Sequence, residues 1–185
     1  MSNVNSPHGF GYVTINKPFP ARTRVFDHLA ADGDAIFQND VVWANSGVSG
    51  EDAPPVQTFA EGATPGETIP LGVALNYAPA STLYQVHVNV DLDSEYEAQD
   101  NNANGTGIVA TNMGKNANVD PTGVAGSTLT GFSGHQINTT GIAVTGTLDM
   151  HLLRRYPDVL NSFGPYCRIL IKFNEMREAT QTAGV

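Results

Sequence analysis

Four acidic side chains occupy every second position near the middle of the chain, and carboxylates at this spacing could serve catalysis or cation binding. They are Asp91, Asp93, Glu95 and Glu97. Two carboxylates about 7 Å apart could act in a glycoside hydrolase, and several carboxylates could hold calcium. Alternate residues of a strand share one face, so a single strand would hold these groups in a row rather than around a point. We therefore interpret them as a solvated acidic strand face.

The remaining residues with catalytic or metal-binding chemistry do not form a recognisable site. In the segment 131–135, Gly134 directly follows Ser133, so the Gly-x-Ser-x-Gly spacing of a hydrolase nucleophile is absent, and a turn between strands is predicted. The histidines lack zinc-site spacing, and Cys167 is the single cysteine. These histidines are His8, His28, His87, His135 and His151. We expect no catalytic, cofactor-binding or metal-binding residues, and therefore no enzyme.

Two segments with alternating polarity predict strands. From Tyr84 to Asp91 apolar and polar side chains alternate strictly, which predicts a half-buried strand with one wet face. We expect this strand to extend over about 83–98. Residues 166–173 predict the last strand, and Cys167 lies on its apolar phase as an expected small buried residue. The apolar phase of this last strand consists of Cys167, Ile169, Ile171 and Phe173.

Composition favours strands and turns over helices. The 185 residues include 19 Gly and 11 Pro, whereas charged residues make up only 15%, so helix-forming Lys, Glu and Arg are scarce. A turn is expected at 156–158. Further short strands are expected at 25–26, 35–37, 41–43, 56–59, 71–75, 126–131, 142–144 and 148–153. Many short strands with frequent turns predict a mainly β fold, a small β-barrel or β-sandwich with little helix.

The chain is expected to contain an arm, one domain and a tail. Residues 1–24 place glycines and prolines between isolated aromatics, which predicts an extended N-terminal arm. Residues 25–175 are expected to form a single β-rich domain with a long loop near 44–70, followed by a C-terminal tail at 176–185. The stretch 100–126 is rich in Asn and Gly, as linkers are, but apolar residues interrupt its polarity.

Charge limits the range of partners. Eighteen acidic residues against nine basic ones give a formal charge of -9, and no basic cluster is larger than Arg154-Arg155. Such a surface repels phosphate groups, so we expect no nucleic-acid partner. The amino terminus lacks the pattern of a signal peptide, and no apolar run approaches the roughly 20 residues of a membrane span. We therefore expect a chain made in the cytoplasm, without a membrane partner.

Several short motifs stand in an order and spacing that one known family shares. Residues 6–10 are similar to an amino-terminal Pro-x-Gly-Phe arm, and residues 35–42 to an Ala-Ile-Phe-x-Gly-Asp-Pro-Val strand and turn. Further similar segments lie at 71–73, 88–91, 96–99, 114–117, 126–134, 152–158 and 171–175. Together these motifs resemble the head decoration, or capsid cement, proteins of tailed bacteriophages. The loop at 44–70 and the Asn-rich stretch after residue 100 depart from the family pattern.

The resemblance implies a non-enzymatic β-rich protein on the outer surface of the virion. It would bind the major capsid protein and stabilise the head against internal DNA pressure. It would act as a symmetric homo-oligomer, with a trimer at local threefold positions favoured over a dimer at twofold positions. In the arm we expect backbone pairing to a coat strand, aromatic side chains in coat pockets and arginines facing coat carboxylates. The expected contact residues are Pro7, Phe10, Tyr12, Phe19, Arg22 and Arg24.

Alternatives stay open on the sequence alone. The arm aromatics could instead cover this domain's own core. A carbohydrate-binding β-sandwich for host attachment could use Trp43, Tyr84 and the acidic strand face, and it predicts glycan binding by the isolated protein. A glycoside hydrolase would depend on the carboxylates from Asp91 to Glu97. Replacing all four carboxylates would abolish hydrolase activity but would leave capsid binding by a cement protein intact.

Overall fold

Antiparallel strands dominate the computed structural model of this chain, which describes residues 3–13, 22–29, 31, 33–44, 55–58, 69–122, 126–174 and 176. Strands account for 38% and helix for 2% of the described residues. Within the described residues, helix is limited to one 3-10 turn, η1 (Ala110–Asn112). The predicted mainly β fold with little helix is confirmed. No helix in this part of the chain has the length and apolar character to cross a membrane.

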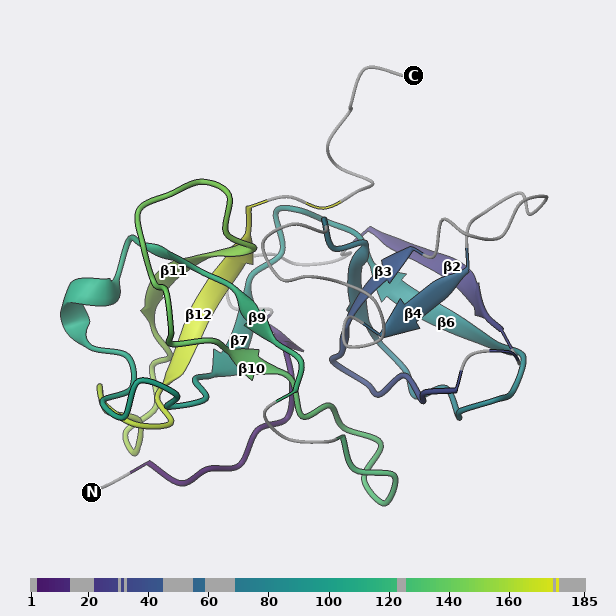
Figure 1. Ribbon diagram of the computed structural model, residues 1–185, viewed down its shortest axis with the longest axis horizontal. Coiled ribbons are helices and arrows are strands. Elements are labelled where there is room, and N and C mark those ends of the chain that lie inside the picture. Colours follow the sequence, from purple (N-terminus) through teal and green to yellow (C-terminus); the bar gives the residue numbers. More distant parts are fainter. Residues whose placement is uncertain are drawn as a thin grey trace.

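One five-stranded antiparallel sheet occupies one half of the molecule, on the left in Figure 1. In spatial order its strands are β1 (Gly11–Tyr12), β7 (Tyr96–Gln99), β12 (Arg168–Phe173), β11 (Met150–Arg155) and β8 (Asn116–Ala117). The short strand β1 belongs to the N-terminal arm and pairs with β7. The arm therefore enters the fold as an edge strand of this sheet.

A second five-stranded antiparallel sheet forms the other half of the molecule (Figure 1). In spatial order its strands are β2 (Thr23–His28), β6 (Tyr84–Asn89), β5 (Gly72–Ala74), β3 (Val41–Ala44) and β4 (Val56–Thr58). A two-stranded ribbon of β9 (Val119–Asp120) and β10 (Gln136–Ile137) lies beside β7. One sheet curls into a half-barrel, which agrees with the predicted barrel or sandwich.

Each half has its own hydrophobic core, and two strands contribute to both. Val41 of β3 and Val73 of β5 belong to the core of the first sheet, whereas the adjacent Val42 and Ala74 belong to the core of the second sheet. Successive side chains of a strand point to opposite faces, so β3 and β5 are buried on both sides. These two strands therefore contribute one face to each of the two cores.

The alternating segment is a half-buried strand, as predicted, but it is shorter than expected. In β6, Val86 and Val88 are buried while Gln85 and His87 are exposed. The expectation of one strand over 83–98 is wrong. The chain leaves the second sheet after β6 and enters the first sheet as β7.

Local side-chain hydrogen bonds explain this break. The Asn89 side-chain oxygen accepts the Asp91 N–H at 3.0 Å, and the Asp91 carboxylate accepts the Asp93 N–H at 2.9 Å. The Ser94 N–H then donates to the Asp91 carbonyl at 3.0 Å and closes a turn. Such short-range bonds offer the backbone an alternative to the strand ladder. The side chains of Asn89 and Asp91, which were expected to lie on the polar face of a continuing strand, therefore end the strand instead.

The other predicted strands are confirmed in part. The predictions at 25–26, 41–43, 56–59, 71–75 and 148–153 correspond to β2, β3, β4, β5 and β11. Three further predictions are wrong, those at 35–37, 126–131 and 142–144. These segments contain a turn or make isolated bridges, as between Ile36 and Ala78. The turn at 128–130 interrupts one of these segments, and Ile36 and Ala143 each make a single bridge instead of a ladder.

The closing strand is buried on the face predicted to be apolar, and one residue on its other face is buried as well. Cys167, Ile169 and Ile171 are completely buried, which confirms the expected environment of the cysteine. Leu170 is completely buried as well, although it lies on the phase expected to be polar. In the sheet register Leu170 lies between Glu97 of β7 and Arg154 of β11, so long side chains flank it on both sides.

Two residues at the end of the predicted arm belong to a strand instead. Residues 3–13 form the described arm, and Thr23 and Arg24 begin β2 instead of ending the arm. Most of the predicted loop at 44–70, and the tail after Met176, lie outside the described residues. The Asn-rich stretch is not a linker, since it contains the buried Ile108 together with η1, β8 and β9.

Candidate functional site

The arm meets a tight turn at Asn39, where the backbone takes the left-handed conformation with φ of 71°. The Phe10 N–H donates to the Asn39 carbonyl at 2.9 Å, and the Asn39 side chain donates to the His8 carbonyl at 3.0 Å. Gly9 lies between them with φ of 75°. A Cβ on Gly9 would lie 2.4 Å from the Ser133 Cβ. Glycine is required here by both conformation and space.

A third segment completes this contact, which we name the three-segment junction: residues 8–10, 37–41 and 131–135. The Gln38 N–H donates to the Gly131 carbonyl at 2.8 Å, and the Ser133 N–H donates to the Gln38 carbonyl at 2.9 Å. All three segments belong to motifs singled out in the sequence. The fold brings together pieces that are far apart along the chain.

The three-segment junction contains a serine, a histidine and an aspartate. The Asp40 carboxylate lies 3.4 Å from His135 Nε2, and His135 Nδ1 accepts the Val41 N–H at 3.1 Å. Ser133 hydrogen-bonds to Asp40, and its Oγ accepts the His135 N–H at 2.9 Å. Burial raises the pKa of Asp40, against the opposing charge of His135 and the hydrogen bonds from Ser133 and Phe37.

This arrangement cannot work as a hydrolytic triad. A general base must accept the serine proton on a ring nitrogen. Both ring nitrogens of His135 already face other groups, Nδ1 the Val41 N–H and Nε2 the Asp40 carboxylate. The Ser133 Oγ accepts the His135 backbone N–H, and all three side chains are buried. The predicted turn lies at 128–130, directly before this segment, and the polar atoms of residues 131–135 hold the junction together.

A second buried carboxylate organises the Asn-rich stretch. Asp100 accepts backbone N–H groups of Asn102 at 2.8 Å, Ile108 at 3.4 Å, Tyr166 at 3.2 Å and Cys167 at 2.7 Å. Burial raises the pKa of Asp100, whereas these N–H groups lower it. Burial also raises the pKa of the Cys167 thiol to about 12, so this thiol is not a nucleophile at neutral pH.

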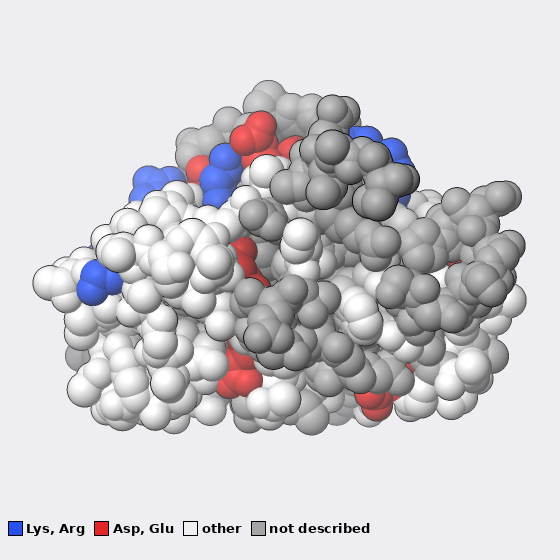
Figure 2. Space-filling model, turned by 45° about the horizontal axis from the view of Figure 1, so that its top comes forward, with Lys and Arg blue, Asp and Glu red and all other residues white. Residues whose placement is uncertain are grey.

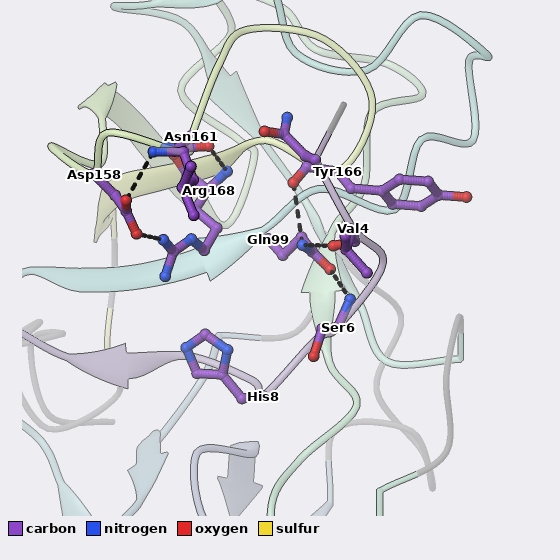
Figure 3. A pocket seen from close by; sticks show the side chains of 10 residues that line it. Val4, Ser6, His8, Gln99, Asp158, Asn161, Tyr166 and Arg168 are labelled. Carbon is purple, nitrogen blue, oxygen red and sulfur yellow. Dashed lines mark hydrogen bonds and ion pairs between the residues drawn. The ribbon is translucent and has the colours of Figure 1, made fainter. Parts of the chain in front are cut away.

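A pocket of about 490 Å³ lies where the arm crosses the edge of the first sheet (Figure 3). The start of the arm forms one wall, Gln99 at the end of β7 forms the floor, and the segment from Asp158 to Arg168 forms the other wall. The Gln99 side chain donates to the Val4 and Tyr166 carbonyls at 2.9 and 3.1 Å and accepts the Ser6 N–H at 2.9 Å. Gln99 therefore ties the arm to the closing strand.

Arg168 is the cation of this pocket, and carboxylates surround it. Its guanidinium donates to Glu97 at 2.9 Å, forms an ion pair with Asp158, and lies 5.1 Å from the ring centre of Tyr156. His8 Nε2 lies 3.8 Å from the same Glu97 oxygen. With two carboxylates on one guanidinium, the positive charge is already balanced. The pocket is therefore poorly suited to bind a phosphate or another anion.

The predicted contact residues divide between the two halves. Phe10 is completely buried in the core of the first sheet, with its ring centre 5.7 Å from that of Phe173. The expectation that Phe10 fills a pocket in a partner is therefore wrong, because its side chain is buried within its own domain. Tyr12 is half-buried and packs edge-on against Tyr96, with the ring centres 6.2 Å apart. Pro7 is also half-buried.

The predicted arginines do not join these arm residues. Arg22 precedes β2 and Arg24 lies within it, so both belong to the second sheet, and both are exposed. Phe19 lies outside the described residues. The predicted set is therefore not a single surface in the part of the chain that the structure describes.

The acidic row is also divided, which corrects the expectation of one solvated strand face. Asp91 and Asp93 lie in the turn after β6, and the Asp93 carboxylate binds the Lys172 ammonium at 3.1 Å. Glu97 is buried in β7 with Arg168. Among the described residues, no group of three or more His, Cys, Asp or Glu side chains could hold a metal ion.

The two aromatics of the carbohydrate hypothesis do not share a surface. Trp43 is partly buried against the core of the first sheet. Tyr84 begins β6, and strand alternation places it on the same face as Val86 and Val88, which belong to the core of the second sheet. A flat aromatic platform for a sugar ring is therefore not formed by this pair.

Sequence reasoning missed Arg168, Asn161 and Gln99 as organising residues. Asn161 donates to the Tyr156 and Arg168 carbonyls at 2.9 and 2.7 Å and accepts the Arg168 N–H at 2.9 Å. The one local signal was the Asp158-x-x-Asn161 spacing after a predicted turn, because Asp and Asn side chains stabilise turns. The partners of Gln99 depend on strand pairing and carry no such signal.

Comparison of the chain with protein-family models, with curated proteins and with solved structures found no match.

Proposed function

We propose that this chain is a structural cement protein of a tailed bacteriophage, bound to the outer surface of the major capsid protein shell. It stabilises the head against internal DNA pressure and has no catalytic role. The sequence resemblance supports this proposal over nearly the whole length of the chain. The observation that carries it is the three-segment junction.

Three of the motifs behind the resemblance lie in that junction. The arm motif at 6–10, the strand and turn at 35–42 and the Gly-bounded segment at 126–134 exchange backbone hydrogen bonds of 2.8 to 2.9 Å. Short motifs that match by chance have no reason to meet in space. Motifs that build one buried junction are expected to be kept together in a family, because each supports the others.

The surface is compatible with an exterior position. A formal charge of -9 keeps the protein away from packaged DNA. On the face drawn in Figure 2, charged atoms of the described residues form small separate groups among uncharged ones. We propose a symmetric homo-oligomer, with a trimer favoured over a dimer, because several weak contacts to neighbouring coat subunits gain by effective concentration.

The test uses phage particles whose genome encodes this chain, prepared with and without its gene. Particles lacking the protein are expected to release DNA at a lower temperature, followed with a fluorescent DNA dye. Adding the purified protein back should restore the wild-type release temperature. Equal release temperatures, together with no binding of the added protein, would show that the proposal is wrong.

A further inference from the structure

A turn beside the pocket exposes apolar side chains at its tip. In the turn from Asp158 to Asn161, Val159 is 100% exposed and Leu160 is 63% exposed. Val4 and Phe163 are also exposed, at 75% and 41%. Turn tips normally carry Gly, Asn, Asp or Ser. We name this set, Val4, Val159, Leu160 and Phe163, the apolar corner.

The apolar corner is one surface, although it comes from opposite ends of the chain. Val4 and Leu160 line the same pocket. Between Leu160 and Phe163, the Ser162 carbonyl accepts the Asn3 side chain at 2.8 Å, and the Ser162 N–H donates back to Asn3 at 3.1 Å. The arm thus starts directly against the turn. Contiguous exposed apolar groups of this kind mark interaction sites more often than single ones do.

The turn is held rigidly by polar groups beneath it. The Leu160 N–H donates to the Asp158 carboxylate at 2.9 Å, and Asp158 pairs with Arg168 (Figure 3). The Asn161 side chain makes the three hydrogen bonds to Tyr156 and Arg168 given above. A surface that is already ordered loses little entropy when a partner binds. The fold therefore presents Val159 and Leu160 in one conformation without burying them in its own core.

The charge beside the apolar corner suggests the character of the partner. Arg155, at the end of β11, donates to the Asn161 carbonyl and lies over the Phe163 ring, with its guanidinium 5.8 Å from the ring centre. Both Arg155 and the neighbouring Arg154 are exposed. They are the largest basic cluster in a chain of formal charge -9. A complementary partner surface carries carboxylates beside an apolar pocket.

A twofold contact centred on the apolar corner is disfavoured. It would bring Arg155 of the two copies close together, and like charges placed across an interface are costly. A contact within a trimer would instead bring a different surface of the neighbouring copy to the corner, and crosslinking from position 159 distinguishes that contact from capsid binding.

We propose that the apolar corner is the surface that binds the capsid. The Val159-Leu160 tip inserts into an apolar pocket of the major capsid protein, and Arg155 faces a carboxylate at the rim of that pocket. This inference rests on the proposed cement function and gives that function a contact surface. It moves the expected contact from the aromatics of the arm to the start of the arm and the turn at 158–161.

The test is sedimentation of purified protein with particles lacking it. The double variant Val159→Ser, Leu160→Ser is expected to bind about tenfold or more weakly than wild type, because two apolar anchors are lost. Leu129→Ser is the matched control, since Leu129 is 94% exposed on a different loop. It should bind like wild type. Arg155→Gln should weaken binding by a smaller factor and reduce its dependence on salt.

The outcomes separate the two proposals. Wild-type binding with an unaffected double variant overturns the apolar corner and leaves the cement function standing, whereas failure of wild type to bind rejects both. A photo-crosslinking residue at position 159 gives a readout that does not depend on affinity. Adducts with the major capsid protein support the inference. Adducts with another copy of this chain contradict it.

Discussion

The three-segment junction and the apolar corner contain the same kinds of residues, but the junction buries its side chains and the corner exposes them. In both, the N-terminal arm meets a distant loop, and Asn or Asp side chains hold the backbone. At the junction, Asp40 and His135 are directed inward and are buried. At the corner, Asp158 and Asn161 hold a turn whose apolar tip points outward. A network of polar side chains therefore does not by itself indicate an active site.

The largest loss of stability is expected from a substitution that disrupts the three-segment junction. Gly9→Ala should lower the free energy of unfolding by about 3 kcal/mol, because Ala is strained at positive φ and its Cβ would clash with Ser133. Gly105→Ala is the control, since Gly105 has φ of 74° but nothing within 4 Å of the added Cβ. It should lose only about 1 kcal/mol. Urea unfolding measures both, and equal losses would mean that close packing at Gly9 is unimportant.

The buried Phe10 changes what an arm deletion can show. Removal of residues 1–20 would take Phe10 out of the core of the first sheet and Asn3 away from Ser162. Loss of capsid binding after such a deletion would therefore follow from a damaged fold. Point variants at exposed positions distinguish binding from folding more clearly.

Smaller losses of stability are expected from one polar substitution in each region, which allows the junction and the apolar corner to be compared directly. Asn161→Ala removes three hydrogen bonds under the apolar corner and should lower the free energy of unfolding by about 2 kcal/mol. Ser133→Ala removes polar contacts at the junction and should destabilise by about 1 kcal/mol. Only Asn161→Ala should weaken sedimentation with particles, measured well below both melting temperatures. Equal weakening by both variants would remove the functional distinction between the regions.

Much of the fold follows from local patterns in the sequence. Alternation identified the buried Val86 and Val88 in β6, and the scarcity of helix formers indicated the mainly β class. Long-range contacts carry no such pattern. Arg168 and Glu97 are 71 positions apart, and they meet only because β7 pairs with β12. The break between β6 and β7 depends on turn bonds of Asn89 and Asp91, whose side chains also fit the polar phase of a strand.

A further test concerns pH and the buried carboxylate Asp100. Burial raises its folded-state pKa, so the folded chain takes up this proton at a higher pH than the unfolded chain does. The contribution of Asp100 to stability is therefore complete below the unfolded value of 3.8 and is lost as the pH rises through the folded-state pKa. Wild type should gain stability relative to Asp100→Asn as the pH falls from neutral. Asp34→Asn, the same change at an exposed position, is the matched control.

The smallest expected change in stability is at the apolar corner itself. Val159→Ser should alter the free energy of unfolding by less than about 0.5 kcal/mol, because a completely exposed side chain loses no buried surface. Thermal unfolding followed by circular dichroism measures this, with Val86→Ser as the contrasting buried position, where a loss of several kcal/mol is expected. A large loss at Val159 would mean that it packs within the fold. The corner would then be structural like the junction, and the contrast between the two regions would fail.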